Sequence, residues 1–276
     1  VQHHIGAEES CEVIWTAGAT DAINLVAQTW GRDHIGQGDT ILLTRMEHHA
    51  NIVPWQMLAD KVGASIEVVE VQGDGTLDAQ QLQQKLAQGP KLFAFTHVSN
   101  TLGTVNDARA LTAQAKAVGA AVLIDGCQAV PHMNVNVQAV DCDFYIFSGH
   151  KSYGPTGIGV LYGKRALLEA MRPWRGGGEM IDVVSLENGT TYAGLPHKFE
   201  AGTPHISGAI ALGVALNWIK GIGAEAIMDH ETMLAAHTRK GLSSIEGIRF
   251  IGSAATAAGV VSFVVDGTHP YDIGTL

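Results

Sequence analysis

A single lysine among small residues is the group in this sequence best suited to covalent chemistry. Lys151 follows the apolar run Phe144 to Ser148 and stands near the start of a glycine-rich segment that extends to Gly159. If the run is a strand that ends in a cleft, the amine is partly desolvated, and its neutral form can make a Schiff base with an aldehyde. The ordinary alternative is an exposed loop lysine, so the neighbouring motifs must decide between the two.

An acid that ends another apolar run is a suitable partner for chemistry at that lysine. Asp125 closes the run that begins at Ala121, where a carboxylate is costly to bury without a cation beside it. A protonated pyridine nitrogen is such a cation, and Gln128 could donate its amide to a phenolate oxygen on the same ring. Pyridoxal 5′-phosphate (PLP) carries both groups, so it is the expected cofactor. A helix N-cap is the structural alternative for Asp125.

A phosphate needs N–H donors, and the segment Trp15 to Asn24 offers them. It reads as a strand, a glycine-containing turn and the start of a helix, and a helix N-terminus presents unpaired N–H groups and the positive end of a dipole. Thr20 adds a hydroxyl donor, although a plain N-cap would place a threonine there as well. Ser148 and His150, near the lysine, are expected to close this phosphate site.

Two adjacent histidines follow a further predicted strand. Because neighbouring residues of an extended chain face opposite sides, His48 and His49 are poorly placed to bind one metal ion, and no metal site is predicted. One of them could stack on a flat cofactor ring and transfer protons near neutral pH, with a hydrogen-bonded structural histidine as the alternative. Asn100 would suit a substrate carboxylate or the ring oxygen, or it could form an Asx-turn.

The elements that must position these groups alternate between short apolar runs and longer helical patterns. This alternation predicts an α/β fold with a mostly parallel central sheet and helices on both faces. The candidate groups lie just past the ends of separate strands, where open α/β sheets build their sites. The expected strands are Ile41 to Thr44, Ile66 to Val71, Leu92 to His97, Ala121 to Asp125, Phe144 to Ser148 and Ile158 to Tyr162, with crossovers long enough for parallel pairing. The expected helices are Asp21 to Trp30, Ile52 to Val62, Asp78 to Leu86, Asp107 to Val118 and Lys164 to Arg172.

The last third of the chain changes character. The segment Gly176 to Gly202 is expected to be a long functional loop or an irregular hairpin. Helices are expected over Ser207 to Lys220 and Ala224 to Ser244, and strands of a new sheet over Ile248 to Ile251 and Gly259 to Val265. We therefore expect a PLP-binding large domain over 1–205, connecting helices over 206–246, and the beginning of a truncated small α+β domain over 247–276.

Composition excludes several classes of function. The chain of 276 residues has 17 Lys+Arg against 27 Asp+Glu, a formal net charge of −10, and no dense basic cluster, so no nucleic-acid partner is expected. The longest uncharged stretch, Ile251 to Val265, is too short to span a bilayer. The cysteines show no CxxC spacing, which indicates a reducing, cytoplasmic protein. The glycines at 157, 159 and 163 miss the dinucleotide-binding pattern.

Together these motifs resemble the class V aminotransferase group of PLP enzymes, and most closely its group II cysteine desulfurases. The resemblance implies the type I fold of PLP-dependent transferases and a homodimer. It also implies removal of sulfur, SO₂ or selenium from L-cysteine, L-cysteine sulfinate or L-selenocysteine to give L-alanine, with sulfur passed to an acceptor protein for iron–sulfur cluster assembly or other pathways. The segments that carry the resemblance are Thr16 to Leu25, Glu47 to Asn51, Asp125 to Gln128, Ser148 to Lys151 and Phe199 to Pro204.

The same resemblance implies roles for individual residues. Lys151 would be the Schiff-base lysine and His48 the stacked acid/base residue. Asp125 would pair with the pyridinium nitrogen, Gln128 would donate to the ring oxygen, and Asn100 would lie nearby. The phosphate would be held by Ala19, Thr20, Ser148 and His150, and by Thr203 from the neighbouring subunit.

The resemblance leaves two points open. Cys11, Cys127 and Cys142 lie in no matching motif, so the persulfide-forming cysteine, the arginine that binds the substrate carboxylate and the family's first segment are expected outside this chain. Another class V activity, kynureninase-like or aminotransferase, is the alternative within the enzyme class. A non-catalytic PLP-binding partner of a sulfur acceptor is the alternative outside it.

Overall fold

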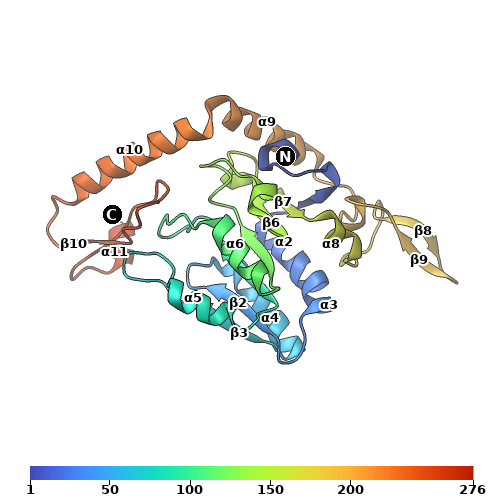
Figure 1. Cartoon of the computed structure of the whole chain (residues 1–276). Coiled ribbons are helices and arrows are strands. Elements are labelled where there is room, and N and C mark those ends of the chain that lie inside the picture. The colour runs from blue at the N-terminus through green and yellow to red at the C-terminus, as the bar shows by residue number, and fades with distance from the viewer. Residues whose placement is uncertain (276) are drawn as a thin grey trace.

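A central seven-stranded sheet flanked by helices dominates the computed structural model, which describes residues 1–275 (Figure 1). The strand order is β1-β7-β6-β5-β4-β2-β3. The predicted α/β fold with a mostly parallel sheet is confirmed. The strands are β1 (Val13–Thr16), β2 (Thr40–Thr44), β3 (Ser65–Val69), β4 (Leu92–Thr96), β5 (Ala121–Asp125), β6 (Phe144–Ser148) and β7 (Gly159–Gly163).

The direction of β7 differs from the expectation of parallel pairing. Strands β3, β2, β4, β5 and β6 are mutually parallel, whereas β7 runs antiparallel to both β6 and β1. The connection from β6 to β7 contains only the short 3₁₀ helix η4 (Gly149–Lys151), and a parallel return needs a longer crossover. Because β7 is antiparallel to both of its neighbours, β1 runs in the same direction as β6.

The helices that cover the sheet lie close to the predicted ranges. Helix α2 ends earlier than expected, because a wider π-helical turn, η2 (Ala27–Gly31), follows it. Asp78 and Asp107 are the N-caps of α5 and α6, where their carboxylates accept hydrogen bonds from Gln81 N and Ala110 N. The covering helices are α2 (Ala19–Val26), α4 (Val53–Val62), α5 (Ala79–Leu86), α6 (Ala108–Ala117) and α8 (Arg165–Ala170). Short helical turns occur at α1 (Gln2–Ile5), η1 (Ser10–Glu12), α3 (Arg32–His34), η3 (His49–Asn51), α7 (Val137–Val140) and η5 (His197–Phe199).

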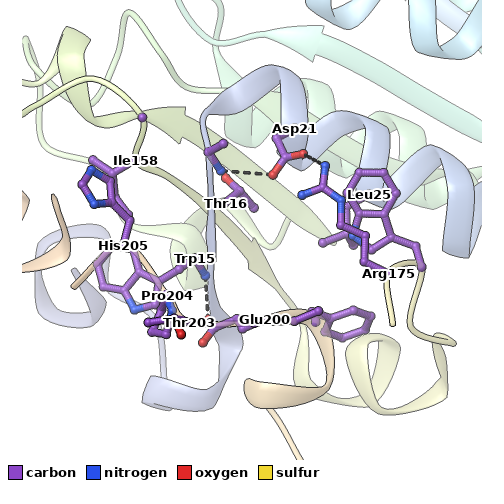
Figure 2. Close-up of a pocket in the computed structure, with 16 residues that line it drawn as sticks. Trp15, Thr16, Asp21, Leu25, Ile158, Arg175, Glu200, Thr203, Pro204 and His205 are labelled. Atoms are coloured by element: carbon purple, nitrogen blue, oxygen red, sulfur yellow. Dashed lines mark hydrogen bonds and ion pairs between the residues drawn. The ribbon is translucent and has the colours of Figure 1, made fainter. Parts of the chain in front are cut away.

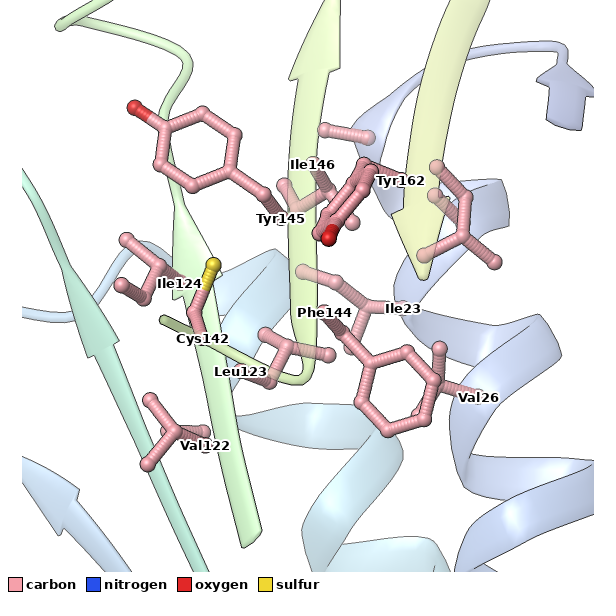
Figure 3. Close-up of a cluster of buried hydrophobic side chains, with 14 of the residues drawn as sticks. Ile23, Val26, Val122, Leu123, Ile124, Cys142, Phe144, Tyr145, Ile146 and Tyr162 are labelled. Carbon is pink, nitrogen blue, oxygen red and sulfur yellow. The ribbon is translucent and has the colours of Figure 1, made fainter. Parts of the chain in front are cut away.

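The core lies on both faces of the middle strands. Every residue of β4, β6 and β7 is buried, as expected for apolar runs covered on both sides. In Figure 3, Ile23 and Val26 of α2 lie over Phe144 of β6. This packing holds the N-terminus of α2 beside the carboxyl end of β6.

The chain beyond residue 175 extends away from the sheet (Figure 1). Of the two expectations for 176–202, the hairpin is the one that forms, from β8 (Ile181–Ser185) and β9 (Gly189–Tyr192). Helices α9 (Ile206–Ile222) and α10 (Ala224–Leu242) meet at an angle of 76°. The two predicted strands follow as β10 (Ile248–Ile251) and β11 (Ser262–Val265), the second beginning three residues later than expected; they pair antiparallel and are followed by α11 (Pro270–Thr275). Among the described residues, no helix by itself has the length and apolar character to cross a membrane, and α9 with α10 meets that test only as a bent pair.

Candidate active site

The carboxyl ends of β1, β2, β4, β5 and β6 lie along one edge of the sheet. Thr16 pairs with Gly159, and Gly159 pairs with Ser148, so the ends of β1 and β6 stand level on either side of β7. On the other side of β6, Asp125 ends β5 and pairs with Thr96 at the end of β4. The sequence-predicted residues therefore converge on this edge, as the parallel register requires.

A close backbone approach brings the turn before α2 onto β7. A Cβ atom built on Gly159 would lie 2.4 Å from the Cα of Gly18, so only glycine allows this contact. The backbone N–H of Ala19 then reaches Ser148 Oγ at 2.9 Å. The N-terminus of α2 is thereby fixed against the end of β6.

A cavity of about 530 Å³ opens at this junction, within the size range of small-molecule sites. The N–H groups of Thr20 and Asp21 belong to the first turn of α2 and have no helical acceptor. The hydroxyl of Ser148 and the side chain of His150 line the same cavity. Its donors and the helix dipole suit an anion such as a phosphate.

Arg175 is a cation at this cavity that the sequence analysis did not find. Its guanidinium lines the cavity and makes a 2.6 Å ion pair with Asp21, whose other oxygen accepts a hydrogen bond from Ala17 N (Figure 2). The ring of Trp174 lies under the guanidinium, 4.1 Å from its carbon. An isolated charge in front of a glycine-rich segment carries no local signal of this tertiary contact.

Asp125 is a buried carboxylate without a cationic partner. The residue is 5% exposed, and its Oδ1 accepts a hydrogen bond of 2.9 Å from Cys127 N. None of the ion pairs found within residues 1–275 includes Asp125. A buried carboxylate in this state favours a cation brought by a ligand.

Lys151 lies in η4, directly after β6, and is half-buried. Burial and the Asp125 charge raise the pKa of the Cys127 thiol, and the Lys151 charge opposes them. Asp125 ends β5, which pairs in parallel with β6, and Lys151 follows the end of β6, so the two residues belong to the same edge of the sheet. Tyr153, two residues after the lysine, has a φ of 58°, a conformation that costs energy for a bulky residue and is concentrated at functional sites.

His48 is exposed and begins the turn η3. Its Nδ1 accepts a hydrogen bond of 3.1 Å from Ala50 N, so the neutral ring carries its proton on Nε2. The ring of His49 lies 5.7 Å away and is also exposed. Within residues 1–275, no group of three or more His, Cys, Asp or Glu side chains is arranged to hold a metal ion.

Other predicted residues lie apart from the cavity between α2 and β6. Asn100 is exposed, and Gln128 is half-buried without a side-chain hydrogen bond among the described residues. Thr203 lines an adjoining cavity of about 230 Å³, together with Glu200 and His205 (Figure 2), and the two cavities share Asp21 and Arg175 in their walls. Glu200 holds this loop in place by accepting a hydrogen bond of 2.8 Å from Trp15 N.

The cysteines are not disposed to act as thiolates near neutral pH. Cys127 and Cys142 are buried, and burial raises the pKa of both thiols. Burial and the nearby Glu9 carboxylate also raise the pKa of Cys11, which is partly exposed. In these environments none of the three thiols is activated as a nucleophile.

Comparison with known proteins places these features in a family. The profile of the family "Aminotransferase class-V" matches residues 1–276. A cysteine desulfurase of Serratia proteamaculans is 51% identical over 271 residues, which make up 98% of this chain and 66% of that protein. A cysteine desulfurase of Pectobacterium atrosepticum is 48% identical over 275 residues, 100% of this chain and 67% of that protein. The chain thus spans about two thirds of the length of these curated relatives.

Solved structures agree with this result. The Escherichia coli cysteine desulfurase CsdA matches with a TM-score of 0.94 at 37% identity, covering 100% of this chain and 68% of that one. The cysteine desulfurase of Thermococcus onnurineus NA1 matches with the same TM-score at 39% identity, covering 99% and 68%. A C-DES mutant with glycine covalently linked to its PLP cofactor matches with a TM-score of 0.83 at 25% identity, covering 99% and 72%. This chain belongs to the class V aminotransferase family.

Proposed function

We propose that this chain is the PLP-binding part of a cysteine desulfurase. The single observation that carries the proposal is the buried Asp125, without an ion pair, on the same sheet edge as Lys151 and the cavity at the N-terminus of α2. Its relatives in Serratia and Pectobacterium are named cysteine desulfurases, which supports the activity. Within the chain, we propose residues 1–205 as the PLP-binding large domain, 206–246 as connecting helices and 247–276 as the start of a small domain.

The chemistry of the donor set fits PLP. A carboxylate that lacks a cation suits a protonated ring nitrogen, an amine suits an aldehyde, and a helix N-terminus with two hydroxyls suits a phosphate. When bound, PLP supplies an aldehyde that condenses with amines and a ring that accepts electrons from the substrate. The structural neighbour C-DES carries a glycine linked to this cofactor.

Each residue then has a defined task. Lys151 would hold the cofactor through its amine, and the same amine, when free, would serve as the base for the substrate Cα proton. Asp125 would keep the ring nitrogen protonated and so maintain the electron demand of the ring. His48 would face the ring and could exchange a proton at Nε2, and Gln128 would donate to the ring oxygen.

The remaining predicted residues would bind the phosphate and the substrate. The Ser148 hydroxyl accepts a hydrogen bond from Ala19 N, so its own proton is free to be donated to a phosphate oxygen. The Thr20 hydroxyl, at the N-terminus of α2, would be a second donor to the phosphate. His150 adds a third side chain from the same cavity. Asn100 is proposed to lie near the substrate and the ring oxygen.

The proposed substrates share a three-carbon amino acid skeleton with a leaving group on Cβ. L-cysteine would lose its sulfur to a protein thiolate and leave alanine, and L-cysteine sulfinate or L-selenocysteine would release SO₂ or selenium. A structure of C-DES with its product cysteine persulfide is also similar to this chain, at 26% identity. The sulfur would pass to an acceptor protein, for iron–sulfur cluster assembly or another sulfur-transfer pathway.

We also propose that the protein is a homodimer of the cytoplasm. The helix α9 exposes an apolar stripe with one residue on each successive turn, which a second copy would cover. The stripe begins three residues after Thr203, which is proposed to reach the phosphate of the neighbouring subunit. The three free cysteines suit a reducing compartment. The stripe consists of Ile206, Ile210, Val214, Trp218 and Ile222.

The activity is tested by adding L-cysteine and excess dithiothreitol to the PLP-loaded protein and measuring alanine and sulfide in the same sample; the dithiothreitol thiolate accepts the sulfur, and its second thiol releases it as sulfide with formation of the cyclic disulfide. The proposal predicts a change in the visible spectrum and equal amounts of the two products, abolished in Lys151→Ala and retained in Lys240→Ala, a change at an exposed lysine. Kynurenine cleavage or exchange with a keto acid would identify a different class V activity. Bound PLP with no product from any of these substrates would identify a non-catalytic PLP-binding protein.

A further inference from the structure

One buried acid near the site has no task in the chemistry above. Glu47 lies in the turn between β2 and η3, directly before His48, and is 8% exposed. No ion pair within the described part of the chain includes it. Burying an acid without a cation is costly, so the contacts that hold it there need an explanation.

Hydrogen bonds from three elements converge on this carboxyl group. Its Oε1 accepts from Thr96 N at 3.0 Å, at the end of β4, and from Thr44 Oγ1 at 2.5 Å, at the end of β2. Its Oε2 accepts from Asn51 Nδ2 at 2.7 Å, in η3. Glu47 thus connects the ends of two parallel strands to the turn that carries His48.

The contact between Glu47 and Asn51 fixes the orientation of the turn that carries His48. Asn51 N donates a hydrogen bond of 2.8 Å to the carbonyl oxygen of His48. The side-chain oxygen of Asn51 accepts from Trp55 Nε1 at 2.9 Å, in α4. Because that oxygen is occupied, the amide nitrogen of Asn51 must face Glu47, and the orientation of the turn depends on an acceptor there.

Through Thr96, Glu47 is also connected to Asp125, the proposed partner of the cofactor ring nitrogen. Thr96 pairs with Asp125 in the sheet. The N–H of the next residue, His97, donates a hydrogen bond of 2.8 Å to the carbonyl oxygen of Asp125. Burial, assisted by the charge of Asp125, raises the pKa of Glu47 to about 8. At neutral pH the carboxyl is therefore mostly neutral and adds no second charge beside Asp125. Of its three partners, only the Thr44 hydroxyl can also act as an acceptor, so in the neutral acid the Thr44 hydrogen bond reverses and Glu47 donates its proton to Thr44 Oγ1.

We propose that Glu47 is a positioning residue that fixes the His48 turn relative to Asp125, so that the two groups frame the cofactor ring from different strands. The inference rests on the function proposed above. Glu47 touches neither cofactor nor substrate and acts through Asn51 on one side and Thr96 on the other.

Glutamine is a sharp test because it matches the neutral acid in shape but not in hydrogen bonding. Its amide nitrogen would face either the Asn51 amide or the Thr96 N–H, and both are donors. One contact is lost in either orientation, and the turn or the end of β4 is released. Leu86→Ala is the matched control, since Leu86 is buried in α5 and its loss destabilises the core.

The experiment measures PLP affinity by equilibrium dialysis and the pH titration of the visible band of the bound cofactor, for the parent protein, Glu47→Gln and Leu86→Ala. The proposal predicts that Glu47→Gln weakens PLP binding about tenfold and shifts the apparent pKa of the band by roughly half a unit or more. Leu86→Ala should lower the melting temperature and leave both cofactor readouts unchanged. A purely structural role for Glu47 would move only the melting temperature.

A folded Glu47→Gln protein with PLP affinity within about twofold of the parent and an unshifted titration would overturn the inference. If Glu47→Gln does not fold, Thr44→Val takes its place, because it keeps the carboxyl and removes the one partner that can accept its proton. Weaker PLP binding with a shifted titration in Thr44→Val would then support the inference, and an unchanged affinity and titration would overturn it. A parent protein that binds no PLP would refute the proposed function, and with it the inference, whereas a parent that binds PLP with an unaffected variant refutes the inference alone.

Discussion

The backbone N–H of Ala19 donates a hydrogen bond of 2.9 Å to Ser148 Oγ, joining two residues 129 positions apart. Ala19 is the first residue of α2 and Ser148 the last of β6. The same hydroxyl lines the cavity at the N-terminus of α2. The proposed phosphate site and the proposed lysine are thus held together by one side chain.

Replacing that side chain tests the phosphate site. Ser148→Ala removes the acceptor for Ala19 N and a donor from the cavity, so we expect PLP affinity to fall about tenfold and the free energy of unfolding by about 1 kcal/mol. The measurement is PLP titration followed by absorbance, with inorganic phosphate as a competitor. Ser10→Ala, at an exposed serine, is the control. Equal affinities in the two variants would contradict the assignment.

Replacing the buried acid tests the ring partner. Asp125→Asn keeps an oxygen for the Cys127 N–H but removes the charge, so we expect PLP binding to weaken by roughly tenfold to a hundredfold. Substrate Cα deprotonation, followed by exchange of the Cα proton in deuterated water, should slow as well. Asp182→Asn, in the exposed hairpin, serves as the control. An unchanged exchange rate in Asp125→Asn would rule out its role.

The close approach of β7 to the α2 turn predicts opposite effects for two Gly→Ala changes. In Gly159→Ala the new methyl group meets the Gly18 backbone at 2.4 Å, which should cost about 1–3 kcal/mol or more. In Gly213→Ala, inside α9, nothing lies within 4 Å, and the substitution should stabilise the protein by about 0.5–1 kcal/mol. Urea unfolding of both variants gives the sign. A neutral Gly159→Ala would contradict the register of β1 on β7.

The raised pKa of Glu47 predicts how stability depends on pH. Its pKa is about 8 in the fold against an ordinary value of 4.5, so between these values the folded protein binds a proton that the unfolded chain does not. The free energy of unfolding therefore falls as pH rises through this window, by up to about 1.4 kcal/mol per pH unit. Glu47→Gln lacks this contribution. The stability difference between parent and variant should shrink from pH 5 to pH 8, and a constant difference would contradict the burial of the acid.

Much of the fold could be predicted because its signals are local. The strands that end at Asp125 and Ser148 are continuous apolar runs, and the structure starts and ends them where the sequence analysis placed them. Asp78 and Asp107 mark helix starts through their own side-chain hydrogen bonds. The antiparallel direction of β7 was not predicted, although the connection from β6 over residues 149–158 is too short for a parallel crossover.

The candidate site was predictable where a residue ends a strand. Thr20, Ser148 and His150 line one cavity because the carboxyl ends of strands share an edge. Arg175 was missed because its ion pair with Asp21 is made across 154 residues of sequence. Glu47 was passed over in favour of its histidine neighbours, since its burial depends on the register between β2 and β4.

The most direct test of the account is to identify the residue that binds the cofactor. The protein is incubated with PLP, reduced with borohydride and digested, and the labelled peptide is sequenced by mass spectrometry. The account predicts a single pyridoxyl label on Lys151, absent from Lys151→Ala. A label on another lysine, or no label on a protein that binds PLP, would contradict it.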